Sequence, residues 1–458
     1  MQLSHAVSAM SPVFDEPNLV VSAGLIPAVG LAARVGLADL ADEHVRVPVV
    51  GANAGAKVMS LVAGMCAGAD SIADMGLLSH GAMGTVFTGV RAPSTLGSFL
   101  RGFTFGHVRQ LDAVACRVLI GLARQNPGLL AGIGSGCVID IDDTVKPVFG
   151  ARKQGAEFGY TGQRGLNAQL AVISTDRSAP VIAATRLRRG ARNSSHGAVR
   201  MITDTIATAR RCGAGHKILV RADSAYCTSA TVAAVADAGA TFSMAITQSA
   251  PVRRAIESIP EGSWTRIDYP QAILDTHSGE LVSAAEVAEV DYVAFTSKAK
   301  KHHRPGRLIV RRIPELNKAK LKDQDPLFPL FRYHAVFSNS DKPLVEAEAE
   351  YRGHAIIEQV IADLKASALA HLPSGKFTAN AAWTVCAAIA FNLTRAIGVN
   401  AGGRFAKATT ATIRNRIINL PARIARSARR LTIHLPHRWL WATSWLRAWA
   451  TSTNTAID

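Results

Sequence analysis

The stretch Val-Ile-Asp-Ile-Asp-Asp-Thr at residues 138–144 alternates apolar and acidic side chains before it ends in a second acid and a threonine. Successive side chains of a β-strand point to opposite faces of the sheet. Asp140 and Asp142 therefore share one face, and Asp143 lies on the other. The pattern predicts a buried strand that presents two carboxylates to one site at its end.

The sequence after this stretch alternates apolar, strand-like runs with helical segments. Turn residues separate the runs, and their lengths are typical of strands and of amphipathic helices. The resulting order is βββ-α-β-α-β, which predicts an α/β fold built on one sheet. The expected strands are 137–142, 166–173, 181–187, 218–223 and 241–246, and the expected helices are 196–212 and 229–238.

Two further acidic residues, Asp223 and Glu358, stand out by their position in the sequence. Asp223 follows the apolar run Ile-Leu-Val-Arg-Ala, where a strand meets a turn. Glu358 lies in the helical segment Tyr-Arg-Gly-His-Ala-Ile-Ile-Glu, and helical spacing puts it on the face of Tyr351 and Lys365. Carboxylates are the oxygen ligands that Mg²⁺ prefers. These three acids, with Asp140, are therefore candidates for a divalent-metal site.

The remaining segments suggest several units around this α/β core. We expect a helical N-terminal domain over 1–130, core segments at 131–248 and 348–400, a β-rich insertion at 249–347 and a basic helical region at 401–458. The Ala-rich segment from 377 to 394 contains polar residues, so we expect a buried helix and no membrane span. An apolar stripe at helical spacing underlies the 401–458 assignment, although Pro421 interrupts it. A membrane-surface helix is the alternative there, and a DNA-facing segment is preferred.

Composition and charge point to a polyanionic partner. The 458 residues include 51 Lys and Arg against 34 Asp and Glu, a formal net charge of +17. The first hundred residues hold four basic and seven acidic side chains, whereas 401–450 hold ten basic and none acidic. Nucleic acid is the first expected partner of such a chain. Six cysteines without a Cys-x-x-Cys pair, and the lack of a signal-peptide pattern, favour the cytoplasm.

Three segments carry candidate DNA-binding residues outside the acidic motifs. The segment 91–112 has the pattern of a short helix–turn–helix that includes Arg101. The glycine-rich segment 150–165 contributes Arg152, Lys153 and Arg164 beside the proposed metal site. Trp264 is a candidate for base stacking, with plain packing as the alternative.

Taken together, the acidic segments resemble the DDE transposases of bacterial insertion sequences, whose catalytic domain is ribonuclease-H-like. The group with a Tyr-x2-Arg-x3-Glu-x6-Lys signature is most similar, because Tyr351, Glu358 and Lys365 have the required spacing and His354 replaces the Arg. Arg352 or His354 would take the place of that Arg at DNA. Asp-Ile-Asp-Asp-Thr at 140–144, Val-Arg-Ala-Asp-Ser-Ala-Tyr at 220–226 and Leu-Pro-Ala-Arg-Ile-Ala-Arg at 420–426 resemble insertion-sequence family 1380.

The resemblance implies cut-and-paste DNA transposition. Asp142, Asp223 and Glu358 would be the catalytic residues and would hold two Mg²⁺ ions, for which Mn²⁺ is expected to substitute. Asp142 aligns better than Asp140 with the first catalytic Asp, and Asp140 stays as an additional or alternative ligand. The expected partners are the terminal inverted repeats, target DNA and a second copy of the chain in a homodimer.

Two alternatives belong to other functional classes. Asp140 to Thr144 also fits the Asp-x-Asp-x-Thr motif of haloacid-dehalogenase phosphatases, in which Asp140 would be the nucleophile and Asp142 the acid/base. The third possibility is a DNA-binding protein without catalysis.

Overall fold

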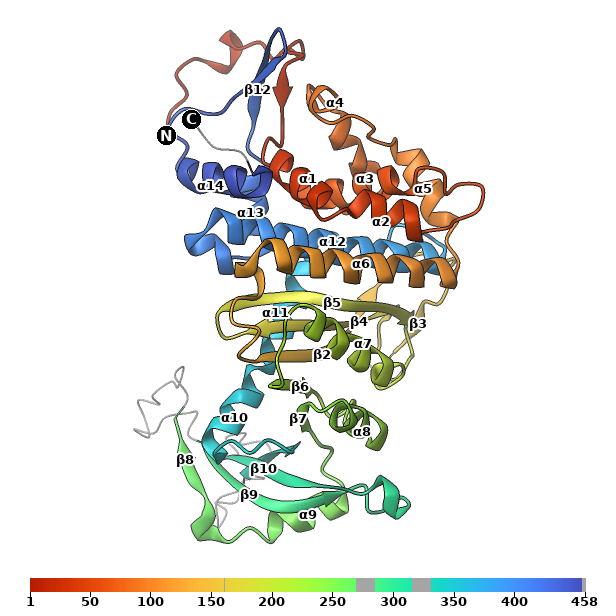
Figure 1. Cartoon of the computed structure of the whole chain (residues 1–458), viewed down its shortest axis with the longest axis vertical. Coiled ribbons are helices and arrows are strands. Elements are labelled where there is room, and N and C mark those ends of the chain that lie inside the picture. The colour runs from red at the N-terminus through yellow and green to blue at the C-terminus, as the bar shows by residue number, and fades with distance from the viewer. Residues whose placement is uncertain (160, 269–284, 315–330, 455–458) are drawn as a thin grey trace.

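The computed structural model describes residues 1–159, 161–268, 285–314 and 331–454, and its centre is one mixed sheet (Figure 1). The sheet order is β5-β4-β2-β6-β7, with the short β3 also paired to β4. These strands are β2 (Cys137–Pro147), β3 (Glu157–Phe158), β4 (Arg164–Thr175), β5 (Ser178–Arg189), β6 (Ile218–Ala222) and β7 (Thr241–Ala245).

The strand directions match the predicted βββ-α-β-α-β order. β2, β4 and β5 form an antiparallel meander, and β6 and β7 run parallel to β2. Helices α7 (Ala198–Arg211) and α8 (Ser229–Asp237) make the connections that parallel strands require. The prediction of an α/β fold is confirmed.

Strand β2 continues well beyond the predicted end. It pairs with β4 as far as Pro147, whereas its parallel pairing with β6 ends at Ile141 opposite Ala222. Asp142 therefore lies within β2 and not at its end. Because β6 stops first, the edge of β2 beyond Ile141 lacks a parallel neighbour, and this opens the sheet beside Asp142.

Helices cover the two faces of the sheet differently. Asp143 pairs on one face with Arg188 of β5, and α7 packs over β2, β4 and β5. Asp140, on the opposite face, contacts His354 in the turn η7 (Gly353–Ala355). This turn joins α10 (Leu344–Arg352) to α11 (Ile356–Lys365), which packs against β2.

The predicted β-rich insertion extends the central sheet. Its strand β11 pairs antiparallel with β7, and β10, β9 and β8 follow in that order. In Figure 1 these strands form the end of the molecule opposite the N-terminal helices. The elements are α9 (Ala250–Glu257), β8 (Thr265–Ile267), β9 (Ala285–Ala294), β10 (Arg304–Pro314) and β11 (Phe331–Ser338).

The N-terminal part is helical, as expected, and packs against one long helix from the second half of the chain. That helix, α12 (Phe377–Ala401), contacts α3, α6 and β5. It is long and apolar enough to span a membrane, yet 94% of its most apolar window is buried inside the protein. The N-terminal helices are α1 (Leu25–Arg34), α2 (Leu37–His44), α3 (Ala54–Ala67), α4 (Met83–Val86), α5 (Pro93–Arg101) and α6 (Phe105–Gln125).

The prediction of a purely helical region over 401–458 is wrong in its middle. A short helix, α13 (Thr410–Ile413), and a π-helical turn to Ile418 precede a hairpin of β12 (Ala422–Ser427) and β13 (Arg430–His434). Pro421 cannot continue a helix, and β12 pairs with β1 (Leu19–Val20) near the N-terminus. The chain returns to helix only at α14 (Ala442–Thr453), which packs on α1 and α12.

Candidate active site

Asp142 and Asp223 lie side by side on neighbouring strands. Ile141 of β2 is paired with Ala222 of β6, and each acid is the next residue along its strand. Adjacent strands are about 4.8 Å apart, and paired residues of parallel strands point to the same face. The two carboxylates therefore meet where β6 ends.

The environment of these carboxylates favours their protonated forms. Burial raises the pKa of Asp142 to about 6, and the charge of Asp223 adds to this effect, while a 2.7 Å hydrogen bond from the Asp143 amide opposes it. Burial likewise raises the pKa of Asp223, against a 3.0 Å hydrogen bond from the Ala225 amide. A cation between the two carboxylates would offset both the cost of burying their negative charges and the repulsion between them.

Helix α11 carries Glu358 along the same side of β2. His354, just before the helix, contacts Asp140. Lys365 is the last residue of the helix, and its pKa is lowered by burial and, to a smaller extent, by the nearby charge of Lys146. From His354 to Glu358 the helix advances about 6 Å. From Asp140 to Asp142 the strand advances about 6.6 Å. Glu358 therefore follows His354 by about one helical turn on the side of β2 that carries Asp142, and its side chain is exposed.

Asp140 has a different role from the predicted one. Its side chain is 0% exposed, and both of its oxygens accept hydrogen bonds from Arg221, at 2.7 and 2.8 Å. His354 Nδ1 lies 2.7 Å from the same carboxylate. Because these partners occupy it, we correct its assignment as a metal ligand and place it in a buried ion pair. A buried, ion-paired Asp140 also argues against the phosphatase alternative, whose nucleophile must reach its substrate.

The other residues of the signature surround this ion pair. The Tyr351 hydroxyl lies 3.4 Å from the Ala222 carbonyl oxygen, and burial and the nearby charge of Asp223 raise the pKa of Tyr351 to about 12. The Tyr351 ring stacks on His354, with centroids 6.1 Å apart. Arg352 donates to Glu348 at 2.8 Å. His354 therefore faces Asp140 and the sheet, so its proposed role as a substitute phosphate ligand is replaced by a structural contact.

The loop after β2 divides its cations between structure and solvent. Lys153 donates to the carbonyl oxygens of Leu372 and, at 3.0 Å, of Ser374, so its ammonium group braces the turn before α12. Arg164 donates to the carbonyl of Gly150 at 3.0 Å. Arg152 is exposed. Of these three predicted DNA contacts, Arg152 keeps its side chain in solvent and the other two hold the loop.

Trp264 belongs to the packing of the insertion. The guanidinium group of Arg312 lies 4.2 Å from the centroid of its ring, and Tyr333 packs beside it at 6.2 Å. The indole directly precedes β8, six strands from β2 in the sheet order, which corresponds to roughly 29 Å at strand spacing. Packing, and not base stacking beside the carboxylates, is its observed role.

The segment around Arg101 forms the two helices α5 and α6, joined by a short turn. α6 packs one face against α2, α12 and β5. Arg101 itself is exposed at the end of α5, where its side chain donates to Ser98 at 3.1 Å. Arg101 remains available for DNA.

Sequence reasoning missed Arg221 and the network below Asp143. Tyr226, 0% exposed, donates its hydroxyl to Asp143 at 2.8 Å, and Arg188 pairs with the same carboxylate at 2.9 Å. A basic residue inside an apolar strand, such as Arg221 in Ile-Leu-Val-Arg-Ala, signals a buried partner. Only the pairing of β2 with β6 identifies that partner as Asp140.

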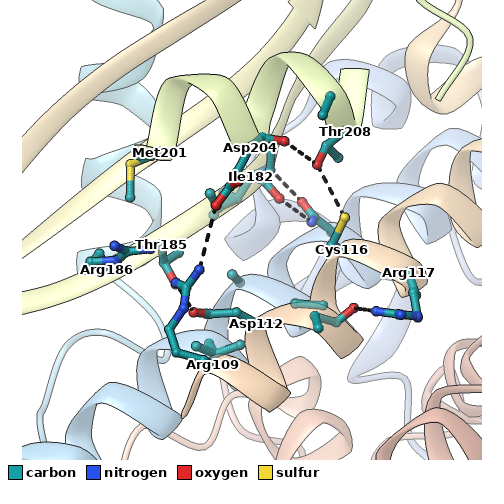
Figure 2. Close-up of a pocket in the computed structure, with 18 of the residues that line it drawn as sticks. Arg109, Asp112, Cys116, Arg117, Ile182, Thr185, Arg186, Met201, Asp204 and Thr208 are labelled. Atoms are coloured by element: carbon teal, nitrogen blue, oxygen red, sulfur yellow. Dashed lines mark hydrogen bonds and ion pairs between the residues drawn. The ribbon is translucent and has the colours of Figure 1, made fainter. Parts of the chain in front are cut away.

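A separate cavity of about 370 Å³ lies between α6, β5 and α7 (Figure 2). Arg109 crosses it, pairing with Asp112 at 2.7 Å and reaching Asp204 at 3.6 Å, and Cys116 contacts Thr208 at 3.3 Å. Its Arg186 is paired with Gln169, which is paired with Asp143, so the cavity lies on the face opposite Asp142. The cavity therefore does not belong to the carboxylate site.

The sheet order and the neighbouring carboxylates are those expected of a ribonuclease-H-like core, which a DDE domain implies. A model of the family described as "Transposase DDE domain group 1" matches residues 131–454. The chain belongs to this family of transposases, for which DNA is the substrate. A comparison with curated proteins gave no match.

The residues present suit the divalent metal ions that the family generally uses. Asp142 and Asp223 offer two neighbouring oxygen ligands whose pKa values are raised by burial and by the charges of neighbouring carboxylates, as expected of a site that a cation completes. Within the described ranges, no three His, Cys, Asp or Glu side chains are gathered into a complete metal site. The described residues therefore bring Asp142 and Asp223 together, and Glu358 lies in the first turn of α11, which packs against β2.

Proposed function

We propose that this transposase cleaves DNA at the terminal inverted repeats of a bacterial insertion sequence and joins the freed 3′-hydroxyl ends to target DNA, in cut-and-paste transposition. The observation that carries the proposal is the juxtaposition of Asp142 with Asp223 at the end of β6, with the helix of Glu358 packed against β2. The motifs at 140–144, 220–226 and 420–426 favour insertion-sequence family 1380 as its group.

Asp142, Asp223 and Glu358 are proposed to hold two Mg²⁺ ions. When bound, the metal ions would activate the attacking oxygen and neutralise charge on the scissile phosphate. The protein's own contribution is positional: β2 and β6 fix two carboxylates by backbone pairing and by amide hydrogen bonds.

Cations near the carboxylates and others on the surface would bind the DNA backbone. Lys365 and Lys146 lie near each other on the side of β2 that carries Asp142, and Arg152 and Arg101 are exposed. Such contacts fix the register of the duplex without reading its sequence. Two DNA ends must be brought together, so we propose a homodimer, acting in the bacterial cytoplasm.

The test is cleavage of a labelled inverted-repeat end by the purified protein with Mg²⁺ or Mn²⁺. Asp223→Asn and Glu358→Gln are expected to abolish cleavage and to leave the Kd for the end within about twofold, because they remove metal ligands and no phosphate contact. Asp237→Asn, an exposed acid at the end of α8, is the matched control and should cleave normally. Metal-dependent cleavage by both Asp223→Asn and Glu358→Gln would refute the site.

The alternative of a DNA-binding protein without catalysis makes the opposite prediction. In that case the wild-type protein would protect the ends in a footprint and never nick them, with either metal.

A further inference from the structure

The turn between α10 and α11 is attached to the sheet by one buried arginine. Arg221 of β6 donates to the carbonyl oxygens of Glu350 and, at 3.0 Å, of Gly353. The Glu350 carbonyl lies in the last turn of α10, where helix carbonyls run out of intrahelical donors, and the Gly353 carbonyl lies in the following turn η7, where it also accepts from the Ile356 amide. Arg221 therefore caps the C-terminus of α10, the helix end where a cation is favoured.

Asp140 balances this arginine from the neighbouring strand. It receives two hydrogen bonds from Arg221, at 2.7 and 2.8 Å, and it is 2.7 Å from His354 Nδ1. His354 belongs to the turn itself, so Asp140 binds the turn both directly and through Arg221. Such a two-point attachment fixes both the distance of the turn from the sheet and its rotation.

Gly353 is the residue that allows the guanidinium group to approach. Its backbone is helical, with φ −59°, so the position does not need glycine for conformational reasons. A Cβ atom there would lie 2.5 Å from Arg221 Nη1. The absence of a side chain at 353 is therefore a condition for the contact.

The attachment precedes Glu358 by little more than one helical turn. Glu358 lies in the first turn of α11, about 7.5 Å along the helix from Gly353. A cavity of about 750 Å³, partly lined by Gly353, Ile356 and Gln359, lies beside this turn. On that side there is room for the turn to shift, so its position depends on the bonds to the sheet.

We propose that Arg221, Asp140 and His354 form a clamp, admitted by Gly353, that positions Glu358 relative to Asp142 and Asp223. The clamp residues are positioning residues, because none of them is placed at the metal or the scissile phosphate. The inference rests on the proposed function, since it assumes that these three acids form the metal site.

The test compares Gly353→Ala with Gly84→Ala, a helical glycine at which a Cβ atom would meet nothing within 4 Å. Mn²⁺ binding without DNA is measured by calorimetry, and the Mg²⁺ dependence of cleavage is measured separately. Gly353→Ala should weaken Mn²⁺ binding and raise the half-saturating Mg²⁺ concentration by about 10- to 100-fold, as seen when residues supporting metal ligands are changed. Gly353→Ala should bind the DNA end with the wild-type Kd. Gly84→Ala should match the wild type in Mn²⁺ binding, in the Mg²⁺ dependence of cleavage and in its Kd for the DNA end.

A second variant covers the case in which Gly353→Ala fails to fold. His354→Ala removes the partly exposed member of the clamp and should shift the same two metal measurements, by a smaller factor. A merely structural role would reduce the folded fraction, and hence the amplitude of cleavage, without moving the half-saturating Mg²⁺ concentration.

The outcomes separate this inference from the proposed function. Wild-type metal affinity in folded Gly353→Ala, or in His354→Ala if the first variant does not fold, would overturn the clamp alone. Wild-type protein that neither binds Mn²⁺ nor cleaves would overturn the proposed function, and the clamp with it.

Discussion

Replacing Asp142 with asparagine should remove activity and make the metal-free protein more stable. Burial raises the pKa of Asp142 from an ordinary value of 3.8 to about 6 in the folded state. Between those pH values the folded protein holds a proton that the unfolded chain has lost. The contribution of Asp142 to the free energy of unfolding is therefore fully present below about pH 4 and is lost as the pH rises through about 6.

The size of the effect follows from the shift in pKa. A pKa difference of about 2 between the folded and unfolded states corresponds to a loss of about 3 kcal/mol in the free energy of unfolding above pH 6, because each pKa unit is worth about 1.36 kcal/mol. Asp142 is partly exposed, so solvent screening should reduce the gain in Asp142→Asn to about 1–2 kcal/mol. Asparagine keeps an oxygen that can accept the hydrogen bond from the Asp143 amide.

Urea unfolding of the metal-free protein at pH 4 and pH 8 measures this gain. Asp142→Asn should be more stable than wild type at pH 8 and equal to it at pH 4, and the difference should shrink or reverse with Mg²⁺, which stabilises only a protein that binds it. Asp15→Asn, an exposed position, is the matched control. An equal gain at both pH values, or none at pH 8, would show that Asp142 is not held in an unfavourable charged state.

Four other substitutions test the assignments of further residues. Tyr226→Phe should cost about 1–3 kcal/mol in urea unfolding, because it removes the 2.8 Å hydrogen bond to the buried Asp143; an unchanged midpoint would contradict this. Trp264→Ala should lower the melting temperature, through lost packing on Arg312 and Tyr333, but should leave the cleavage rate within about twofold; a large loss of rate at constant stability would restore its stacking role. Arg152→Ala should reduce the salt dependence of DNA binding by about one phosphate contact, whereas Lys153→Ala should mainly lower stability; the reverse ranking would mean that the loop rearranges on DNA.

The sequence determined the catalytic candidates because their signals are local. Period-2 alternation in 138–144 separates Asp143 from Asp140 and Asp142, and the apolar run before Asp223 marks a strand end. The order of strands and helices predicted the α/β class in the same way. Such signals depend only on residues within a few positions of one another.

Tertiary structure alone decided which acids share a site and which are used for packing. Period-2 alternation places Asp140 and Asp142 on the same face, and only the register of β2 with β6 pairs Asp140 with Arg221 and leaves Asp142 beside Asp223. The same holds for the C-terminal hairpin: helical spacing continues past Pro421 in the sequence, but Pro421 and the pairing of β12 with β1, about 400 residues away in the chain, make residues 422–427 a strand. Strand pairing joins residues that are distant in sequence, so a local pattern can name the carboxylates of this site but cannot assign their partners.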